Sequence, residues 1–128
     1  MRYLLFILLS TFALPFQDSQ KKAQEPEYEM HTRDGKATYY ASYFNGRRTA
    51  SGEIFSNKKF TAAHRKLPFG TKVTVLNKAN GRTVVVRIND RGPFNKRFII
   101  DLSQAAAREL GFYSKGVASV EITYALKD

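Results

Sequence analysis

Six carboxylates lie between residue 35 and the C-terminus, and two of them stand where acid–base chemistry is possible. Asp90 follows the apolar run 83–88 and opens the turn Arg91-Gly92-Pro93. A carboxylate at a strand end is held by a rigid scaffold and stays open to a substrate. A turn-capping aspartate paired with Arg91 explains the same position without any chemistry. Glu53 follows Ala50-Ser51-Gly52 in a predicted loop and is the second candidate.

The other titratable groups have simpler explanations. We expect Glu109, Glu121 and Asp128 on the surface, because they lie on a helix, on an outward strand position and at the chain end. Asp101 precedes a predicted helix, where its charge complements the helix N-terminus, although it could also support a neighbouring site. His64 alone is most simply structural. With no cysteine and two histidines, we predict no metal, no cofactor and no thiol nucleophile.

Several short strands and one helix must position these residues. Alternation and β-branched residues predict strands over 36–43, 72–75, 83–88, 98–100 and 120–126. Asn80-Gly81 predicts a two-residue type I′ turn between the second and third of them. The nearly continuous Val and Ile of 83–88 predicts a strand shielded on both faces.

The helix is predicted over 104–110, capped by Ser103 and ended by Gly111. Many short strands with one helix in about 90 residues imply a closed β-barrel, since closure removes exposed strand edges. The fold class is therefore mainly β.

Four segments in this order resemble a known family. They are TASGE at 49–53, TAAHRKLPFGT at 61–71, RINDRGPF at 87–94 and IDLS at 100–103. Together they closely resemble the barrel domain of the RlpA (rare lipoprotein A) family, bacterial lytic transglycosylases of peptidoglycan. The resemblance covers residues 35–126 and implies a six-stranded double-psi β-barrel with one short α-helix.

The resemblance also implies an activity and a site. Such enzymes cleave the β-1,4 bond between N-acetylmuramic acid and N-acetylglucosamine, leaving 1,6-anhydromuramic acid. Asp90 matches the family's catalytic acid. Glu53 and His64 match residues of the same groove, and we expect them to belong to the catalytic site, where they bind the sugar and tune the environment of Asp90. We also expect the substrate to be held by four further side chains, those of Arg65, Asn89, Arg91 and Asp101. The aromatic rings of Tyr39, Tyr40, Tyr43 and Phe94 could stack on sugars or belong to the core.

The charge of the domain favours an anionic partner. From residue 35 onward, 17 Lys and Arg face 6 Asp and Glu. A cell wall that carries carboxylates suits this charge, whereas a basic surface that only confers solubility explains it equally well. We do not expect nucleic acid as the partner, and salt-sensitive duplex binding would revive that possibility.

The N-terminal segment predicts export. Arg2 and the apolar run 3–16 form a signal peptide too short to span a membrane, although an uncleaved anchor is the alternative. We expect residues 1–16 to be the signal peptide, 17–34 a flexible linker and 35–128 the barrel. Without a cysteine for lipidation, we expect a soluble monomer in the periplasm or outside the cell, associated with the wall.

The chain ends just after the last predicted strand, so we expect no glycan-binding SPOR domain here. Expansins and barwin-like proteins share the barrel, and several bind polysaccharide without cutting it. A non-catalytic wall-binding module is therefore the competing hypothesis. Asp90, Glu53 and His64 together favour the enzyme.

Overall fold

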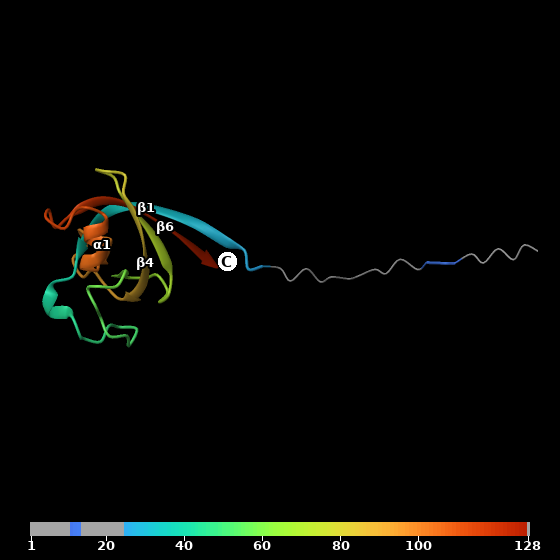
Figure 1. The fold of residues 1–128 in the computed structure, drawn as a ribbon, viewed down its shortest axis with the longest axis horizontal. Helices are drawn as coiled ribbons and strands as arrows, with labels where there is room; N and C mark the ends of the chain where they lie inside the picture. The colour runs from blue at the N-terminus through green and yellow to red at the C-terminus, as the bar shows by residue number, and fades with distance from the viewer. Residues whose placement is uncertain (1–10, 14–24, 128) are drawn as a thin grey trace, which may run out of the picture.

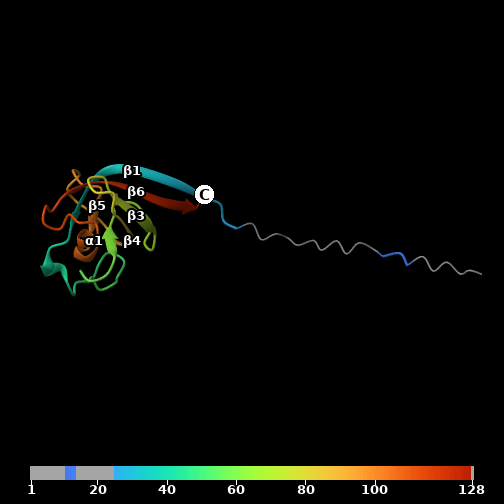
Figure 2. The same cartoon turned by 45° about the horizontal axis from the view of Figure 1, so that its top comes forward.

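A closed six-stranded barrel makes up the domain in the computed structural model, which describes residues 11–13 and 25–127. Around the barrel the strands follow the order β1-β5-β2-β4-β3-β6 (Figures 1 and 2). The strand bounds are β1 Tyr28–Tyr39, β2 Thr61–Ala63, β3 Lys72–Asn77, β4 Thr83–Asp90, β5 Ile100–Leu102 and β6 Ala118–Lys127. Two pairs, β1–β5 and β2–β4, are parallel and the rest are antiparallel. The predicted barrel is confirmed.

Alternating apolar residues fill the barrel. On β4, Val84, Val86 and Ile88 point inward and are buried, and the even-numbered residues of β6 from Ala118 to Tyr124 do the same. Val85 between them is 53% exposed, so the prediction that this strand is shielded on both faces is wrong. Its outer face meets solvent because no second layer covers it.

The first strand begins seven residues before the predicted domain boundary at Gly35. Residues 28–34, assigned to the flexible linker, pair antiparallel with residues 121–127 of β6. In Figure 1, β1 and β6 leave the barrel together as a two-stranded ribbon. On β1 the side chains of residues 28–34 are largely exposed, so no apolar alternation marked this half of the ribbon in the sequence.

The connection between β3 and β4 differs from the predicted type I′ turn. That turn needs positive φ at both central residues, and among the described residues only glycines have positive φ. The amide of Gly81 instead donates to the Asn77 carbonyl at 2.8 Å, which closes a four-residue loop. The side chains of Asn77 and Asn80 both donate to the carbonyl of Leu110, and this tie to the helix end selects the longer loop.

The short helix α1, Gln104–Glu109, packs against the barrel, and a 3₁₀ turn η1 spans Ser42–Phe44. The Ser103 side chain accepts from the Ala106 amide at 3.3 Å, as predicted for the cap. Gly111 follows with φ of 76°. No helix in the ranges 11–13 and 25–127 is long and apolar enough to cross a membrane. The predicted signal peptide lies almost entirely outside the described residues.

Candidate active site

A β-bulge places Asp90 on the outer face of the barrel. Ala62 is paired with Ile88, but the next residue, Ala63, is paired with Asp90, so Asn89 is an extra residue in β4. If Asn89 were paired regularly and no bulge formed, the alternation of Val86 and Ile88 would send the Asp90 side chain into the core. Bulges re-aim side chains in this way and are frequent beside active sites.

Three donors surround the Asp90 carboxylate. Its Oδ1 accepts from the amides of Ala50 and Arg91, each at 2.8 Å, and its Oδ2 accepts from the Tyr40 hydroxyl at 2.5 Å. Burial, and then the hydrogen bond to Asp90, raise the pKa of Tyr40 well above its usual range. Tyr40 therefore stays protonated and donates. The strand scaffold fixes the carboxylate in one orientation.

Asp101 opens into the same cavity. This cavity has a volume of about 290 Å³ and is lined by Thr38, Tyr40, Phe44, Asp90, Arg91, Gly92, Pro93, Phe94, Asn95, Phe98 and Asp101. Burial, and then the charge of Asp90, raise the pKa of Asp101 to about 7. Its Oδ1 is buried and has no hydrogen-bond partner in the described part of the chain. Phe94 lies at the rim and is 93% exposed.

Glu53 is engaged away from this cavity. It receives two hydrogen bonds from Arg87, at 2.6 and 2.8 Å, and one from the Asn89 side chain at 3.2 Å. The Arg87 hydrogen bonds hold the pKa of Glu53 below its ordinary value. A carboxylate held this way is ionised at neutral pH and suits orientation better than proton donation. The loop 49–53 links both groups, since Ala50 contacts Asp90.

His64 faces a different cavity, at one end of the barrel. That cavity has a volume of about 510 Å³ and includes Ile122 and Tyr124. The Nδ1 atom of His64 accepts from the amides of Lys66 and Leu67, at 3.0 and 3.1 Å. Burial and then nearby cations, Arg65 first, lower the pKa of His64. The neutral ring thus carries its proton on Nε2. His64 is hydrogen-bonded to Asp90 through the backbone, since the His64 amide donates to the Asp90 carbonyl at 3.1 Å.

The two arginines expected at the substrate brace the backbone. Arg65 Nη1 donates to the carbonyls of Pro93 and Phe98, each at 2.8 Å, and so joins the rims of the two cavities. Arg91 Nη1 donates to the carbonyls of His64 and Leu67, and its guanidinium stacks on Phe69 at 4.0 Å. Since these contacts are to the protein itself, the binding of substrate by either arginine stays a prediction.

The structure thus groups Asp90 with Asp101 and Glu53 with Asn89, and it sets His64 apart. Sequence reasoning missed Arg87 as the partner of Glu53 and the role of Asn89 as the bulge residue. Arg87 could have been found from strand alternation, since it shares the outer face of β4. The bulge left no pattern in the sequence.

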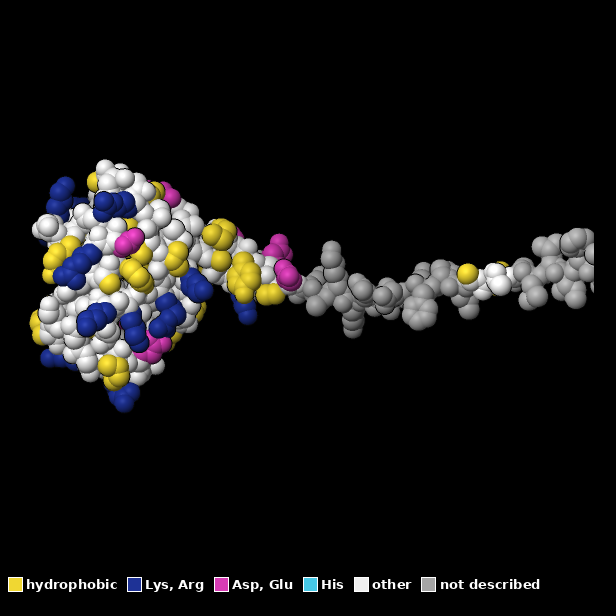
Figure 3. Space-filling view, in the orientation of Figure 1, with side chains coloured by type: hydrophobic (Ala, Val, Ile, Leu, Met, Phe, Trp, Pro, Cys, Tyr) yellow, Lys and Arg dark blue, Asp and Glu magenta, His cyan; other side chains and the backbone are white. Residues whose placement is uncertain are grey.

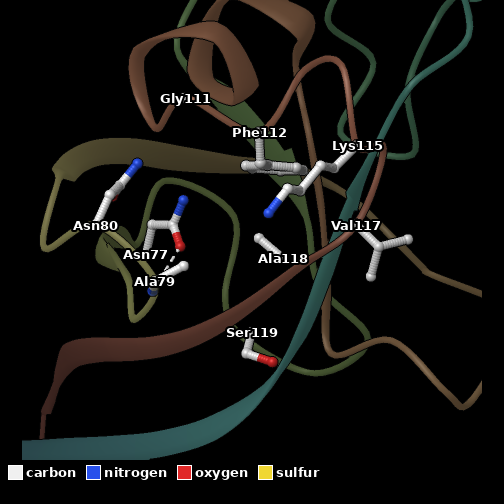
Figure 4. A pocket seen from close by; sticks show the side chains of 9 residues that line it. All are labelled: Asn77, Ala79, Asn80, Gly111, Phe112, Lys115, Val117, Ala118 and Ser119. Atoms are coloured by element: carbon white, nitrogen blue, oxygen red, sulfur yellow. Dashed lines mark hydrogen bonds between the residues drawn. The ribbon is translucent and has the colours of Figure 1, made fainter.

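A further cavity, of about 400 Å³, contains none of these residues. Figure 4 shows Lys115 extending into it beside Phe112, with Asn77 and Asn80 across from them. The described residues 11–13 and 25–127 hold no cluster of three His, Cys, Asp or Glu side chains suited to a metal ion. Lys and Arg side chains spread over the face of the domain in Figure 3, with few acidic ones among them.

Comparisons with known proteins agree with this architecture. A family model described as lytic transglycolase matches residues 32–122. The endolytic peptidoglycan transglycosylase RlpA of Haemophilus influenzae is 49% identical over 96 residues, covering 75% of this chain and 33% of the relative. A probable endolytic peptidoglycan transglycosylase RlpA of Synechocystis is 56% identical over 90 residues, covering 70% of this chain and 28% of the relative. The chain thus spans about a third of these relatives' length.

Two solved structures share the fold. The Streptomyces papain inhibitor has a TM-score of 0.61 at 28% identity, over 76% of this chain and 96% of the inhibitor. An expansin of Clavibacter michiganensis in complex with cellohexaose has a TM-score of 0.60 at 21% identity, over 77% of this chain and 52% of the expansin. The family match over most of the chain, the close relatives and the six-stranded barrel lead to one conclusion: the chain belongs to the RlpA-type lytic transglycolase family, with a double-psi β-barrel domain.

Proposed function

We propose that this protein is a peptidoglycan lytic transglycosylase that cleaves the β-1,4 bond between N-acetylmuramic acid and N-acetylglucosamine. The observation that carries the proposal is the carboxylate of Asp90, fixed by three donors at an open cavity whose rim presents the exposed ring of Phe94. The relatives named as transglycosylases at about half identity support the same reaction.

One carboxyl group suffices for this reaction. Protonated Asp90 gives its proton to the glycosidic oxygen as the bond to C1 breaks. The C6 hydroxyl of the muramic acid then attacks C1 and returns its proton to Asp90, which leaves a 1,6-anhydro ring. The nucleophile belongs to the substrate, so the protein supplies acid–base chemistry and orientation. An ordinary glycosidase would need a second carboxylate to activate water or attack the sugar.

The remaining residues hold the substrate and the site. Glu53 is kept ionised by its hydrogen bonds from Arg87, so it is suited to accept hydrogen bonds from sugar hydroxyls, with the Asn89 side chain beside it. The Nε2 proton of His64 is available to a substrate group at the neighbouring cavity. Phe94 and Tyr43, 93% and 66% exposed, can stack on sugar rings, whereas Tyr40 is buried. Arg65 and Arg91 have guanidinium nitrogens besides Nη1 with which to bind substrate carboxylates.

The substrate sets the place of action. Peptidoglycan lies outside the cytoplasmic membrane, so we propose an exported monomer that acts in the periplasm or at the wall. The excess of basic residues over acidic ones favours a glycan that carries carboxylates over a neutral polysaccharide. No metal or cofactor is needed for the chemistry described, and nucleic acid is not proposed as a partner.

The decisive experiment is mass spectrometry of purified glycan strands after incubation with the protein. Wild type should release fragments that end in 1,6-anhydromuramic acid, with no oxygen taken up from labelled water. D90N should slow cleavage by about 10²–10⁴-fold, the range for losing general acid–base catalysis, and still bind glycan. Incorporation of labelled oxygen would mean that the enzyme is a hydrolase. Glycan binding without any cleavage would support a wall-binding module, as considered from the shared barrel fold.

A further inference from the structure

Asp101 and Asp90 flank one alanine on the outer face of the barrel. In the strand register, Ala63 of β2 lies opposite Asp90 of β4 on one side and opposite Asp101 of β5 on the other. Residues opposite each other on neighbouring strands point to the same face. Two strand spacings, roughly 10 Å, separate the backbones of the two aspartates, and only a methyl group stands between them. Both side chains line the same cavity.

The two carboxyl groups have opposite surroundings. The Asp90 carboxyl group accepts three hydrogen bonds, from the Tyr40 hydroxyl and from the amides of Ala50 and Arg91. Asp101 has a buried oxygen, Oδ1, without any partner in the described structure. A buried ionised carboxylate with an unpaired oxygen is costly, and a protonated carboxyl in that place costs far less. One proton on the pair, carried by Asp101, is the arrangement these contacts favour.

The proposed reaction leaves a problem that Asp101 resolves. Asp90 must carry a proton when the glycosidic bond breaks, yet in each of its three hydrogen bonds it is the acceptor. The charged or titratable groups lining the cavity besides Asp101 are Asp90, Tyr40 and Arg91. Tyr40 already donates to Asp90, and Arg91 directs its Nη1 to the carbonyls of His64 and Leu67. Among the described residues that line this cavity, Asp101 is the one left to hold a proton in reserve beside Asp90.

We propose that Asp101 is a positioning residue that acts through Asp90, as the holder of the single proton that the carboxyl pair shares. The inference rests on the proposed function and goes beyond it by adding a second carboxyl group. The proton passes from Asp101 to Asp90 through a water molecule in the cavity that both line, and Asp90 delivers it to the glycosidic oxygen. The proton of the C6 hydroxyl then returns to Asp90, and from there to Asp101. The pair ends the cycle with the proton it had at the start.

The burial of Asp101 and the charge of Asp90 beside it agree with this role, since both raise the pKa of Asp101 to about 7. Two carboxyls that interact in this way titrate as a pair rather than as independent groups. Wild-type cleavage should therefore decline above about pH 7, as the pair loses its shared proton. A merely structural Asp101 would leave the pH profile unmoved when an isosteric amide replaces it.

The first test is the pH profile of glycan cleavage. D101N should move the alkaline limb of the profile to lower pH by at least about one unit. The rate at pH 7 then falls at least about fivefold, while the rate at pH 5 stays within about twofold of wild type. D101E, which restores a carboxyl group, should recover the wild-type limb in part. E109Q is the matched control, because Glu109 is an exposed carboxylate on α1 and is not among the residues that line the cavities described above. An alkaline limb unchanged in D101N overturns the proposal.

The second test needs neither activity nor a folded D101N protein. Carbon-13 NMR titration of the aspartate carboxyls in wild type should find Asp101 titrating near pH 7. In D90N the pKa of Asp101 should fall, because a neighbouring negative charge is gone. If Asp101 titrates like an exposed aspartate, or ignores D90N, the pair does not share a proton. Absence of cleavage by wild type at every pH would overturn the proposed function, and the titration would still decide the pairing.

Discussion

Replacement of Asp101 by asparagine should make the folded domain less sensitive to pH and more stable in alkali. Burial and the charge of Asp90 raise the pKa of Asp101 from 3.8 to about 7 in the folded state. Between these values the folded chain keeps a proton that the unfolded chain has lost, so stability falls as pH rises. A shift of about 3 units, at about 1.36 kcal/mol per unit, amounts to about 4 kcal/mol lost by pH 8.

The assay is urea unfolding of wild type and D101N from pH 4 to pH 8.5. Because asparagine stays neutral, the free energies of unfolding of D101N and wild type should differ near pH 4 only by the effect of the substitution on packing. Between pH 4 and about pH 7, D101N should become steadily more stable than wild type. The full gain of about 4 kcal/mol is an upper bound, because a charged Asp101 can draw water into its cavity. The control E109Q should show no such gain in the free energy of unfolding over wild type as the pH rises. If the two stability curves for wild type and D101N stay parallel over the whole range, Asp101 is not protonated in the folded state.

Three more predictions concern the supports of the site. Tyr40→Phe removes the donor to Asp90 Oδ2 and should cost about 1–3 kcal/mol in urea unfolding; no loss would show that this hydrogen bond is not made in solution. Deletion through residue 34 removes the pairing of 28–34 with β6, so a chain starting at Gly35 should lose about 1–3 kcal/mol against one starting at residue 25; equal thermal midpoints would contradict this. Gly35→Ala places a Cβ within 2.6 Å of Ile99 and should cost about 1–3 kcal/mol, partly regained in a double variant with Ile99→Val; a neutral Gly35→Ala would mean the contact yields freely.

Much of the barrel could be predicted because its strands alternate strictly. Val73 and Val75 of β3 and Val120 and Ile122 of β6 mark buried faces directly in the sequence. The helix was predictable for a similar reason, since Ser103 and Gly111 flank an alanine-rich turn and both act as expected. In each case the signal is local, so neighbouring residues alone determine it.

Elements whose cause is distant were missed. Strand β2 is three buried residues, Thr61–Ala63, too short for any period to show. The start of β1 depends on backbone pairing with β6, about 90 residues away, and its exposed side chains carry no trace of it. The loop after Asn77 is determined by hydrogen bonds from the side-chain amides of Asn77 and Asn80 to the carbonyl of Leu110, at least 30 residues further along the chain. Contacts across the barrel override the local preference of Asn80-Gly81.

The candidate site shows the same division between local and distant causes. Asp90 could be identified from its place at a strand end, but the direction of its side chain depends on the extra residue Asn89. If Asn89 were paired regularly and no bulge formed, alternation would direct the Asp90 carboxylate toward the buried side chains of Val86 and Ile88, where an ion without partners is not tolerated. The bulge therefore turns an inward position into an outward one and brings Asp90 into register with Ala63 and Asp101. A carboxyl pair arises from residues of two separate sequence segments, and they can approach each other because the strand between them contributes only a methyl group.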